Sequence, residues 1–338
     1  MAGFNQILAE IQAAQGDPAL GNPFDYVRRK YIGRLAAKTG RHTIVYASRF
    51  LQGGPPGLEQ LVPITDEDVQ GLMATVQGQT SGKLDFLLHS PGGSPEAAEG
   101  IVSYLRSKFT DVRVIVPHLA MSAATMVACS ANRILMGRHS FLGPTDPQLF
   151  IQSPLGFRYV AAQAILEQFD RARKDCTTPE GLRAWAPILP QYGPDLLVTC
   201  ENASQLTRRL VHEWLREYML ADIKPAKRRG QMVRRLADFL TDHQQHKTHG
   251  RHLDRATLRS HGMVIDDLEN DPDEQDLVLS IYHTVTIGFS FIPFLGKIIE
   301  NHLGCMFAKA GMVSPPPGGV ANQPPEQPST AQPEPAAQ

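Results

Sequence analysis

Length, charge and cysteine usage limit what this chain can be. Its 338 residues suffice for a sizeable hydrophobic core, in one large domain or two interlocked ones. A net charge of -1 excludes a strong overall attraction to nucleic acid or to an anionic membrane surface. Four cysteines without C-x-x-C spacing argue against a disulfide framework or a cysteine zinc site, and favour a reducing compartment.

The chain before residue 41 is predicted to be helical. Hydrophobic spacing indicates one helix near residues 4–14 and a second over residues 23–37, whose basic patch at 28–30 is expected to be a solvated face. The first residues lack a charged segment followed by an apolar one, so we expect no secretory signal.

Short apolar runs alternate with helical segments between residues 41 and 150. Strands are predicted at residues 43–47, 84–89, 112–116 and 133–136, and helices begin at Thr65 and Ser94. This alternation predicts an α/β fold built from repeated strand–helix units around a largely parallel sheet. Functional groups of such sheets gather at the carboxyl ends of the strands.

A glycine turn and a serine turn follow two of these strands. Gly92 and Gly93 follow the strand at 84–89, and Ser122 precedes Ala123 where a strand meets a helix. A nucleophilic serine needs backbone N–H groups aimed at a developing oxyanion, and both a first helical turn and a glycine turn can supply them. A plain turn and a helix cap account for the same residues, so this pattern alone leaves both interpretations open.

Residues 90–93, 121–126 and 134–148 together resemble the Clp/crotonase superfamily. More narrowly, they resemble the serine dehydrogenase proteinase family, related to the Clp proteolytic subunit and to signal peptide peptidase A. The resemblance is dense over residues 41–149 and returns at 246–264 and 299–304. It implies a serine peptidase with Ser122 as nucleophile and the amides of Gly92, Gly93 and Ala123 as oxyanion donors.

The general base is open among three residues. The resemblance implies a triad in the chain order Ser, Asp, His, which corresponds to Ser122, Asp146 and His249 in this sequence. His139 lies near the position of the Clp subunit's histidine, and Lys174 would serve a Ser–Lys dyad of the signal peptide peptidase A type. Asp146 has an alternative, purely structural interpretation, in which its side chain stabilises the turn at residues 143–147.

Helical periodicity dominates after residue 150. Helices are predicted at residues 161–174, 179–189, 203–219 and 227–240. A histidine cluster follows, comprising His243, His246, His249, His252 and His261. Because no H-E-x-x-H pattern appears, we favour a role as catalytic base for one of these histidines over a zinc site.

The apolar run at 285–299 is too short and too interrupted to cross a bilayer, so we expect a buried helix or an oligomer contact.

Four segments are expected along the chain. They are an N-terminal helical segment at 1–40, a Clp/crotonase-like catalytic core at 41–150, a mainly helical part at 151–313 that completes the site and makes oligomer contacts, and a tail at 314–338. The tail is rich in Pro, Gln and Ala, and is expected to be disordered.

The sequence therefore predicts a cytoplasmic serine endopeptidase that cleaves a peptide or protein substrate through an acyl-enzyme on Ser122. No metal, other cofactor, nucleic acid or membrane span is expected, and the absence of a Walker motif argues against its own ATPase. The resemblance implies a homo-oligomer. Two alternatives remain: a catalytically silent scaffold with the same fold, and crotonase-type acyl-CoA chemistry, which does not require a serine at this turn.

Overall fold

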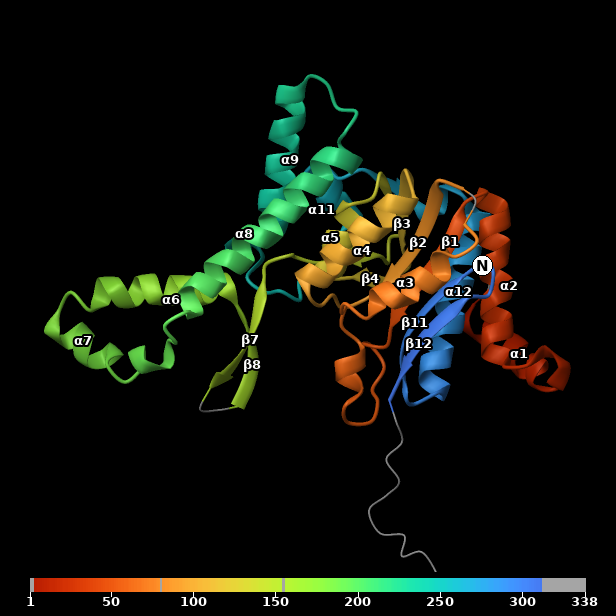
Figure 1. Cartoon of the computed structure of the whole chain (residues 1–338), viewed down its shortest axis with the longest axis horizontal. Coiled ribbons are helices and arrows are strands. Elements are labelled where there is room, and N and C mark those ends of the chain that lie inside the picture. The colour runs from red at the N-terminus through yellow and green to blue at the C-terminus, as the bar shows by residue number, and fades with distance from the viewer. Residues whose placement is uncertain (1–2, 80, 154–155, 312–338) are drawn as a thin grey trace, which may run out of the picture.

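A computed structural model describes residues 3–79, 81–153 and 156–311. Its α-helices are α1 (Phe4–Gln15), α2 (Pro23–Thr39), α3 (Asp68–Val76), α4 (Pro95–Lys108), α5 (Ala123–Cys129), α6 (Ala162–Asp175), α7 (Pro179–Trp185), α8 (Leu196–Trp214), α9 (Ala226–Thr241), α10 (His243–His246), α11 (Arg255–Ser260) and α12 (Pro272–Phe291). Its strands are β1 (His42–Ser48), β2 (Lys83–His89), β3 (Asp111–Val116), β4 (Leu119–Ala120), β5 (Arg133–Met136), β6 (Phe141–Leu142), β7 (Gln148–Ser153), β8 (Gly156–Ala161), β9 (Leu253–Asp254), β10 (Ile265–Asp267), β11 (Leu295–Asn301) and β12 (Met306–Ala310). Figure 1 shows an α/β body from which a helical arm extends to one side.

The body is built on one sheet. Within the described residues it has seven strands in the order β10-β5-β3-β2-β1-β11-β12. The strands from β10 to β1 run parallel to one another, whereas β11 is antiparallel to β1 and β12 is antiparallel to β11. The predicted α/β fold with a largely parallel sheet is confirmed, and the four predicted strands are β1, β2, β3 and β5.

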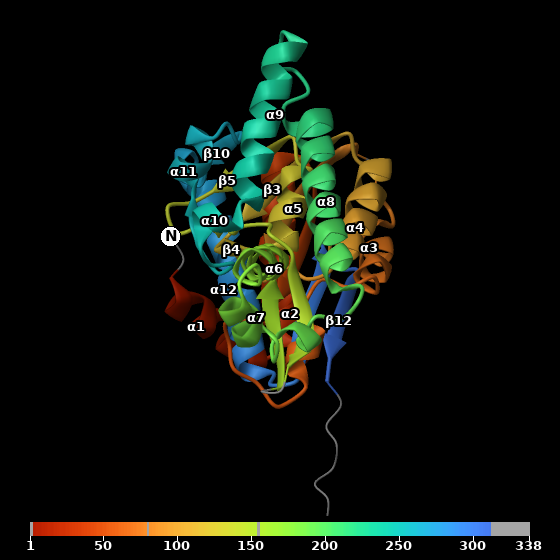
Figure 2. The ribbon, with the colours of Figure 1, turned by 90° about the vertical axis from the view of Figure 1, so that its left-hand side faces the viewer.

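Helices cover both faces of this sheet. Neighbouring residues of one strand are buried on opposite faces, as Ile44 and Val45 of β1 are. Helices α3, α4 and α5 pack on the first face, and α1, α2 and α12 on the second; Figure 2 shows α3 and α4 on one side of the body and α1 and α12 on the other. Burial on both faces explains why these strands are largely apolar on both of their faces.

A second, smaller sheet positions the candidate site. It has the order β4-β6-β9. Strands β4 and β6 are parallel, with Ala120 opposite Leu142, and β9 is antiparallel to β6, with Leu253 opposite Leu142. The end of β4, the end of β6 and the start of β9 therefore lie at the same edge of the small sheet.

The arm consists of the β7–β8 hairpin, α6, α7 and the first part of α8 (Figure 1). It has a small hydrophobic cluster of its own around Ala162, Ile165 and Cys200. Helix α8 leads back to the body, where Leu210 and Trp214 join the main core. The 3-10 segments of the chain are η1 (Pro18–Leu20), η2 (Leu58–Leu61), η3 (Leu189–Gln191) and η5 (Leu268–Asn270), and η4 (Leu215–Met219) is a π-helical turn.

Three local predictions are wrong. The β7–β8 hairpin stands at the start of a part of the chain that was predicted to be mainly helical, where no strand was predicted. The run at 285–299 is not one helix, because α12 ends at Phe291 and β11 begins at Leu295. Arg28 is not a solvated cation: it is 2% exposed and pairs with Glu300 of β11. The predicted tail at 314–338 lies outside the described residues.

None of the helices in the described part of the chain combines the length and the apolar character that a membrane-crossing helix requires.

Candidate active site

Ser122 occupies a strained turn between β4 and α5. Its φ and ψ are 53° and -120°, a region that non-glycine residues rarely adopt. The turn is held from both sides: Ala124 N donates to Met121 O at 2.9 Å, and Met126 N donates to Ser122 O at 3.1 Å. Nucleophilic serines occur at sharp, strained strand-to-helix turns of this kind, because the turn presents the hydroxyl group away from the backbone.

The glycine turn after β2 lies directly against the serine turn. Gly92 has a φ of 96°, and an added Cβ would lie 2.6 Å from Met121 O and 2.7 Å from Ser122 Cβ. At Gly93 an added Cβ would lie 2.4 Å from the backbone of Ile64. Both glycines are therefore required by close backbone approach, and the two predicted turns meet as expected.

The three predicted oxyanion amides are not equivalent. Ala123 is the first residue of α5, so its N–H has no acceptor within the helix. Gly92 O accepts from Ile64 N and Ser94 N donates to Ile64 O, which leaves the Gly93 N–H directed away from Ile64. The Gly92 N–H, by contrast, donates to Ser90 Oγ at 3.2 Å.

Asp146 is the centre of a buried hydrogen-bond network. Its side chain is 2% exposed, and its two oxygens accept from two imidazoles. His249 Nδ1 donates to Oδ1 and His243 Nδ1 donates to Oδ2, each at 2.8 Å. Gln148 Nε2 also donates to Oδ2, at 2.9 Å. This arrangement binds a carboxylate and fixes the orientation of each imidazole ring.

The small sheet places the three predicted triad residues at one edge. Ser122 comes two residues after the end of β4, and Asp146 comes four residues after the end of β6. His249 precedes the start of β9 by four residues. Thr125 joins the first two segments, because its hydroxyl group accepts from Gly143 N at 3.0 Å. The structure thus brings Asp146 and His249 into contact and places Ser122 at the same edge.

A hydrogen bond from Ser122 to a histidine is not among the contacts of the described residues. The Ser122 side chain does not cap α5, and the Nδ1 atoms of His243 and His249 donate to Asp146. His249 is the more accessible of the two imidazoles, with 27% of its side chain exposed against 18% for His243.

The alternative bases lie elsewhere. His139 precedes β6, at the opposite end of that strand from Asp146, and its ring lies against Gly137. It acts electrostatically on His118 and His283, whose pKa values are lowered first by burial and then by this neighbour. Lys174 is exposed on α6, in the arm. The structure brings neither residue to Asp146.

His243 is the functional candidate to which the sequence assigned no role. In the sequence it is one member of the histidine cluster and carries no distinguishing motif. The sequence signal that could have located the start of its helix is Asp242, the residue before it. Asp242 Oδ1 caps the short helix α10 by accepting from Gln245 N at 3.0 Å.

The other clustered histidines have local packing partners. His246 is buried with Nε2 bonded to Phe239 O, His252 stacks on Phe141, and His261 stacks on Phe239. Across the described residues, no group of three or more His, Cys, Asp or Glu side chains is arranged to hold a metal ion.

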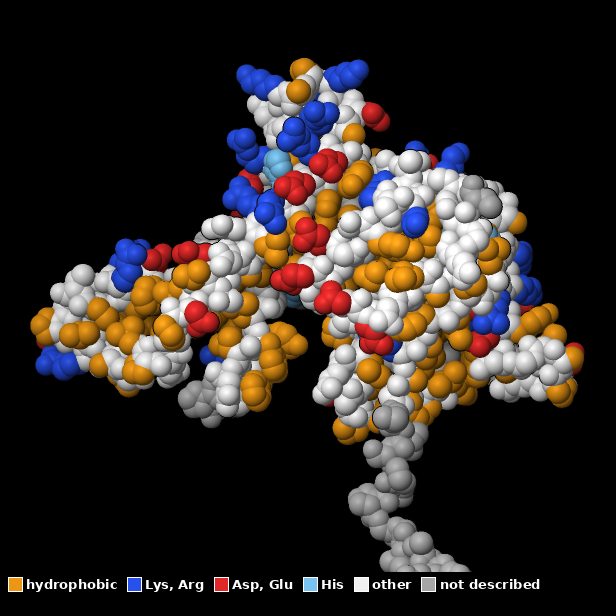
Figure 3. Space-filling view, in the orientation of Figure 1, with side chains coloured by type: hydrophobic (Ala, Val, Ile, Leu, Met, Phe, Trp, Pro, Cys, Tyr) orange, Lys and Arg blue, Asp and Glu red, His pale blue; other side chains and the backbone are white. Residues whose placement is uncertain are grey.

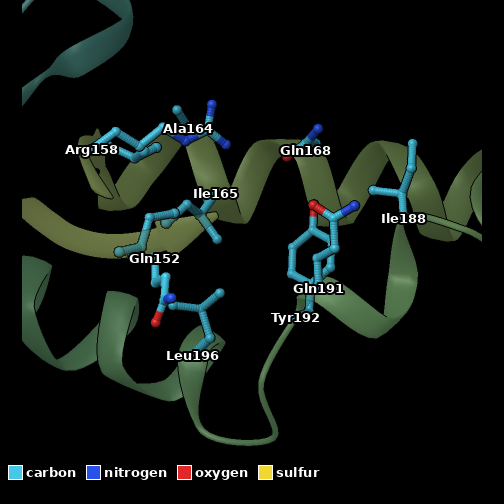
Figure 4. A pocket seen from close by; sticks show the side chains of 11 residues that line it. Gln152, Arg158, Ala164, Ile165, Gln168, Ile188, Gln191, Tyr192 and Leu196 are labelled. Carbon is cyan, nitrogen blue, oxygen red and sulfur yellow. The ribbon is translucent and has the colours of Figure 1, made fainter. Parts of the chain in front are cut away.

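A cavity with a well-formed lining lies remote from this site. It has a volume of about 720 Å³ and lies in the arm, between the β7–β8 hairpin, α6 and the start of α8 (Figure 4). Its lining includes Ile165, Tyr192 and Leu196 but not Ser122, Asp146 or His249. This cavity therefore does not mark the candidate site, which rests on its chemical groups.

The fold is a Clp-like α/β fold, and its candidate site brings a serine turn and a carboxylate bound by two imidazoles to one sheet edge. Residues 24–176 match the model of a family described as ClpP-like SDH-type serine proteinase. Over this region the chain is similar to that family, as its sequence motifs indicated. The matched region contains Ser122 and Asp146, whereas both histidines lie beyond it.

Two curated relatives are proteins of Methanocaldococcus jannaschii that are described as uncharacterized. One is 35% identical over 123 residues, which cover 36% of this chain and 43% of the relative. The second is 33% identical over 87 residues, which cover 25% of this chain and 30% of the relative. The chain thus spans less than half the length of either relative.

Proposed function

We propose that this chain is a serine endopeptidase that cleaves peptide or protein substrates through an acyl-enzyme on Ser122. The observation that carries this proposal is the strained backbone of Ser122, at the sheet edge where Asp146 binds His249. Backbone strain persists only where the surrounding structure enforces it, and it concentrates at functional sites.

Each group has a distinct role in this proposal. His249 Nε2 removes the proton of the Ser122 hydroxyl group as the serine attacks the peptide carbonyl, and later returns it to the leaving amine. Asp146 holds the Nδ1–H of His249 and stabilises the imidazolium that forms. Substrate binding has to bring Ser122 and His249 within hydrogen-bond distance, as is common for catalytic groups that are not in contact in the free enzyme.

The oxyanion is assigned to the N–H groups of Ala123 and Gly93. Both are free of the local hydrogen bonds that occupy the Gly92 N–H. Gly92 contributes instead by letting the backbone approach Ser122. Removal of a single donor from an oxyanion hole typically costs about 10²–10³ in rate.

We further propose a homo-oligomer with contacts through the arm. The hairpin exposes a group of aromatic rings. The ring centroid of Phe150 lies 5.2 Å from that of Phe157 and 4.9 Å from that of Tyr159. All three residues are at least 60% exposed. Figure 3 shows hydrophobic side chains gathered on the arm. Exposed apolar patches mark interaction surfaces.

The four free cysteines support a cytoplasmic location for this chain.

The test is covalent labelling with a fluorophosphonate probe, followed by intact-mass measurement. Wild-type protein is expected to gain one adduct, and Ser122→Ala none. His249→Ala is expected to slow labelling by about 10²–10⁴, the usual contribution of a general base. His139→Ala and Lys174→Ala are matched controls that should label at the wild-type rate.

Two results would overturn the proposal. An adduct that persists in Ser122→Ala would place the reactive group elsewhere. The absence of any adduct on folded wild-type protein would favour the silent scaffold.

A further inference from the structure

Asp146 binds two imidazoles, whereas the proposed triad uses one. We propose that His243 is a positioning residue that fixes the Asp146 carboxylate so that Oδ1 alone serves His249. This inference rests on the proposed function. Its basis is that the two imidazoles donate to different oxygens of one buried carboxylate, each at 2.8 Å.

A tight backbone turn makes this double contact possible. His243 begins α10, and Lys247, the residue after that helix, adopts a left-handed conformation with a φ of 66°. The chain reverses there, so that residues 243 and 249 approach Asp146 from two directions. Lys247 and Ser122 are the two non-glycine residues with positive φ in the described part of the chain.

The two imidazoles have different surroundings, which separates their roles. His243 lines a polar cavity of about 340 Å³ together with Asp146, Gln163, Arg208 and Asp238. His249 does not line that cavity, and it lies four residues before β9 at the edge that holds Ser122. His249 is therefore the imidazole available to the serine, and His243 holds the carboxylate from behind.

A second donor on Oδ2 has a clear physical effect. A carboxylate that is 2% exposed needs hydrogen-bond donors in place of the water it has lost. Without His243, Gln148 is the remaining side-chain donor to Oδ2 within the described residues. The carboxylate can then rotate toward the polar cavity, and the orientation of His249 is lost. Because ring orientation matters most in the transition state, the loss should appear in kcat rather than in KM.

The experiment compares three replacements by their rates of fluorophosphonate labelling and their peptidase kcat and KM. His243→Asn keeps an N–H donor near the position of Nδ1 and should stay within about threefold of wild type. His243→Phe keeps the ring but has no donor, and should lower the labelling rate and kcat by about tenfold with KM unchanged. His249→Asn lacks any Nε2 and should lose at least about 10² in rate.

A proton NMR readout does not depend on activity. Imidazole N–H groups bonded to a carboxylate give low-field resonances, and wild-type protein should show two. His243→Asn should remove one of them, and Asp146→Asn should shift both.

The outcomes separate this inference from the proposed function. A wild-type protein that labels, with His243→Phe equal to wild type, overturns the positioning role alone. A greater loss in His243→Asn than in His249→Asn overturns it by making His243 the base. A wild-type protein with both low-field resonances and no labelling overturns the peptidase proposal and leaves the two-imidazole network standing.

Discussion

The Ser122 turn depends on small residues around it. The strained φ of 53° is enforced by backbone hydrogen bonds on either side and by Thr125, whose hydroxyl group donates to Ala120 O at 2.7 Å. Strain of this kind costs on the order of 1–3 kcal/mol, and the surrounding packing has to offset it. Gly92, which lies directly against this turn, tolerates little change.

Gly92→Ala should both destabilise the protein and silence the site. An added Cβ would lie 2.6 Å from Met121 O, and the φ of 96° is unfavourable for alanine. We expect a loss of about 1–3 kcal/mol in the free energy of unfolding, and a fall of about 10² or more in the rate of Ser122 labelling. Urea unfolding and probe labelling measure the two effects.

Gly33→Ala is the matched control. Gly33 lies in α2, where an added Cβ meets no atom within 4 Å, so alanine should stabilise the helix by about 0.5–1 kcal/mol. Equal labelling rates for Gly92→Ala and wild type would contradict the prediction, because they would show that the glycine turn does not affect the reaction of Ser122 with the probe.

Local motifs and the family resemblance made Ser122 and Asp146 candidates from the sequence, but the histidines could not be sorted by local motifs. Each imidazole reaches Asp146 across a long interval, 97 residues for His243 and 103 for His249. The turn at Lys247 and tertiary packing decide which of the five clustered histidines contact Asp146. A resemblance suggested His249, and no pattern in the sequence indicated a second imidazole.

At the scale of elements, a buried ion pair supports the segment that holds the glycine turn. Ile64 bonds to both sides of Gly93, and Asp68 follows four residues later at the start of α3. Asp68 is fully buried and accepts from Lys297 Nζ of β11 at 2.7 Å and from Tyr46 of β1 at 2.7 Å. Burial lowers the pKa of Lys297 to about 8. The pair thereby ties the Ile64 segment to two strands of the sheet.

Lys297→Met should be strongly destabilising. Removal of one partner leaves a buried carboxylate without its principal cation, which typically costs about 3–5 kcal/mol. Urea unfolding should show a lower midpoint. Arg183→Ala, which breaks an exposed pair with Glu180, should leave the midpoint almost unchanged. If both variants unfold at the wild-type midpoint, the buried pair does not stabilise this segment.

Elements that are buried on both faces could be predicted from the sequence, and elements of the arm could not. β1, β2, β3 and β5 are apolar runs because helices cover them on each side. Strand β8 is largely exposed, so its aromatic residues do not follow a core-facing pattern. The run at 285–299 hides a change from helix to strand, although Pro293 and Gly296 mark it in the sequence.

At the scale of the whole molecule, the site lies where the body joins the arm and α9. Asp146 ends the body segment two residues before β7, and His243 follows two residues after α9. Gln244 of α10 donates to Glu167 of α6 at 2.8 Å, which adds a contact between the arm and the histidine segment. This contact thus connects the arm to the segment that carries both imidazoles of the Asp146 network.

The stability of the whole fold should fall in mild acid because buried histidines are neutral. Burial lowers the pKa of His89, which is 0% exposed, to about 3. In the unfolded chain its pKa is about 6.5, so the unfolded state binds more protons between these values. Its contribution is complete above about pH 6.5 and is lost as the pH falls toward 3, and this residue alone accounts for about 2 kcal/mol between pH 7 and pH 5. His89→Phe removes this titration but not those of the other buried histidines, so its free energy of unfolding in urea should depend less on pH than that of wild type. Parallel curves for the two proteins from pH 7 to pH 5 would show that His89 is not held neutral in the core.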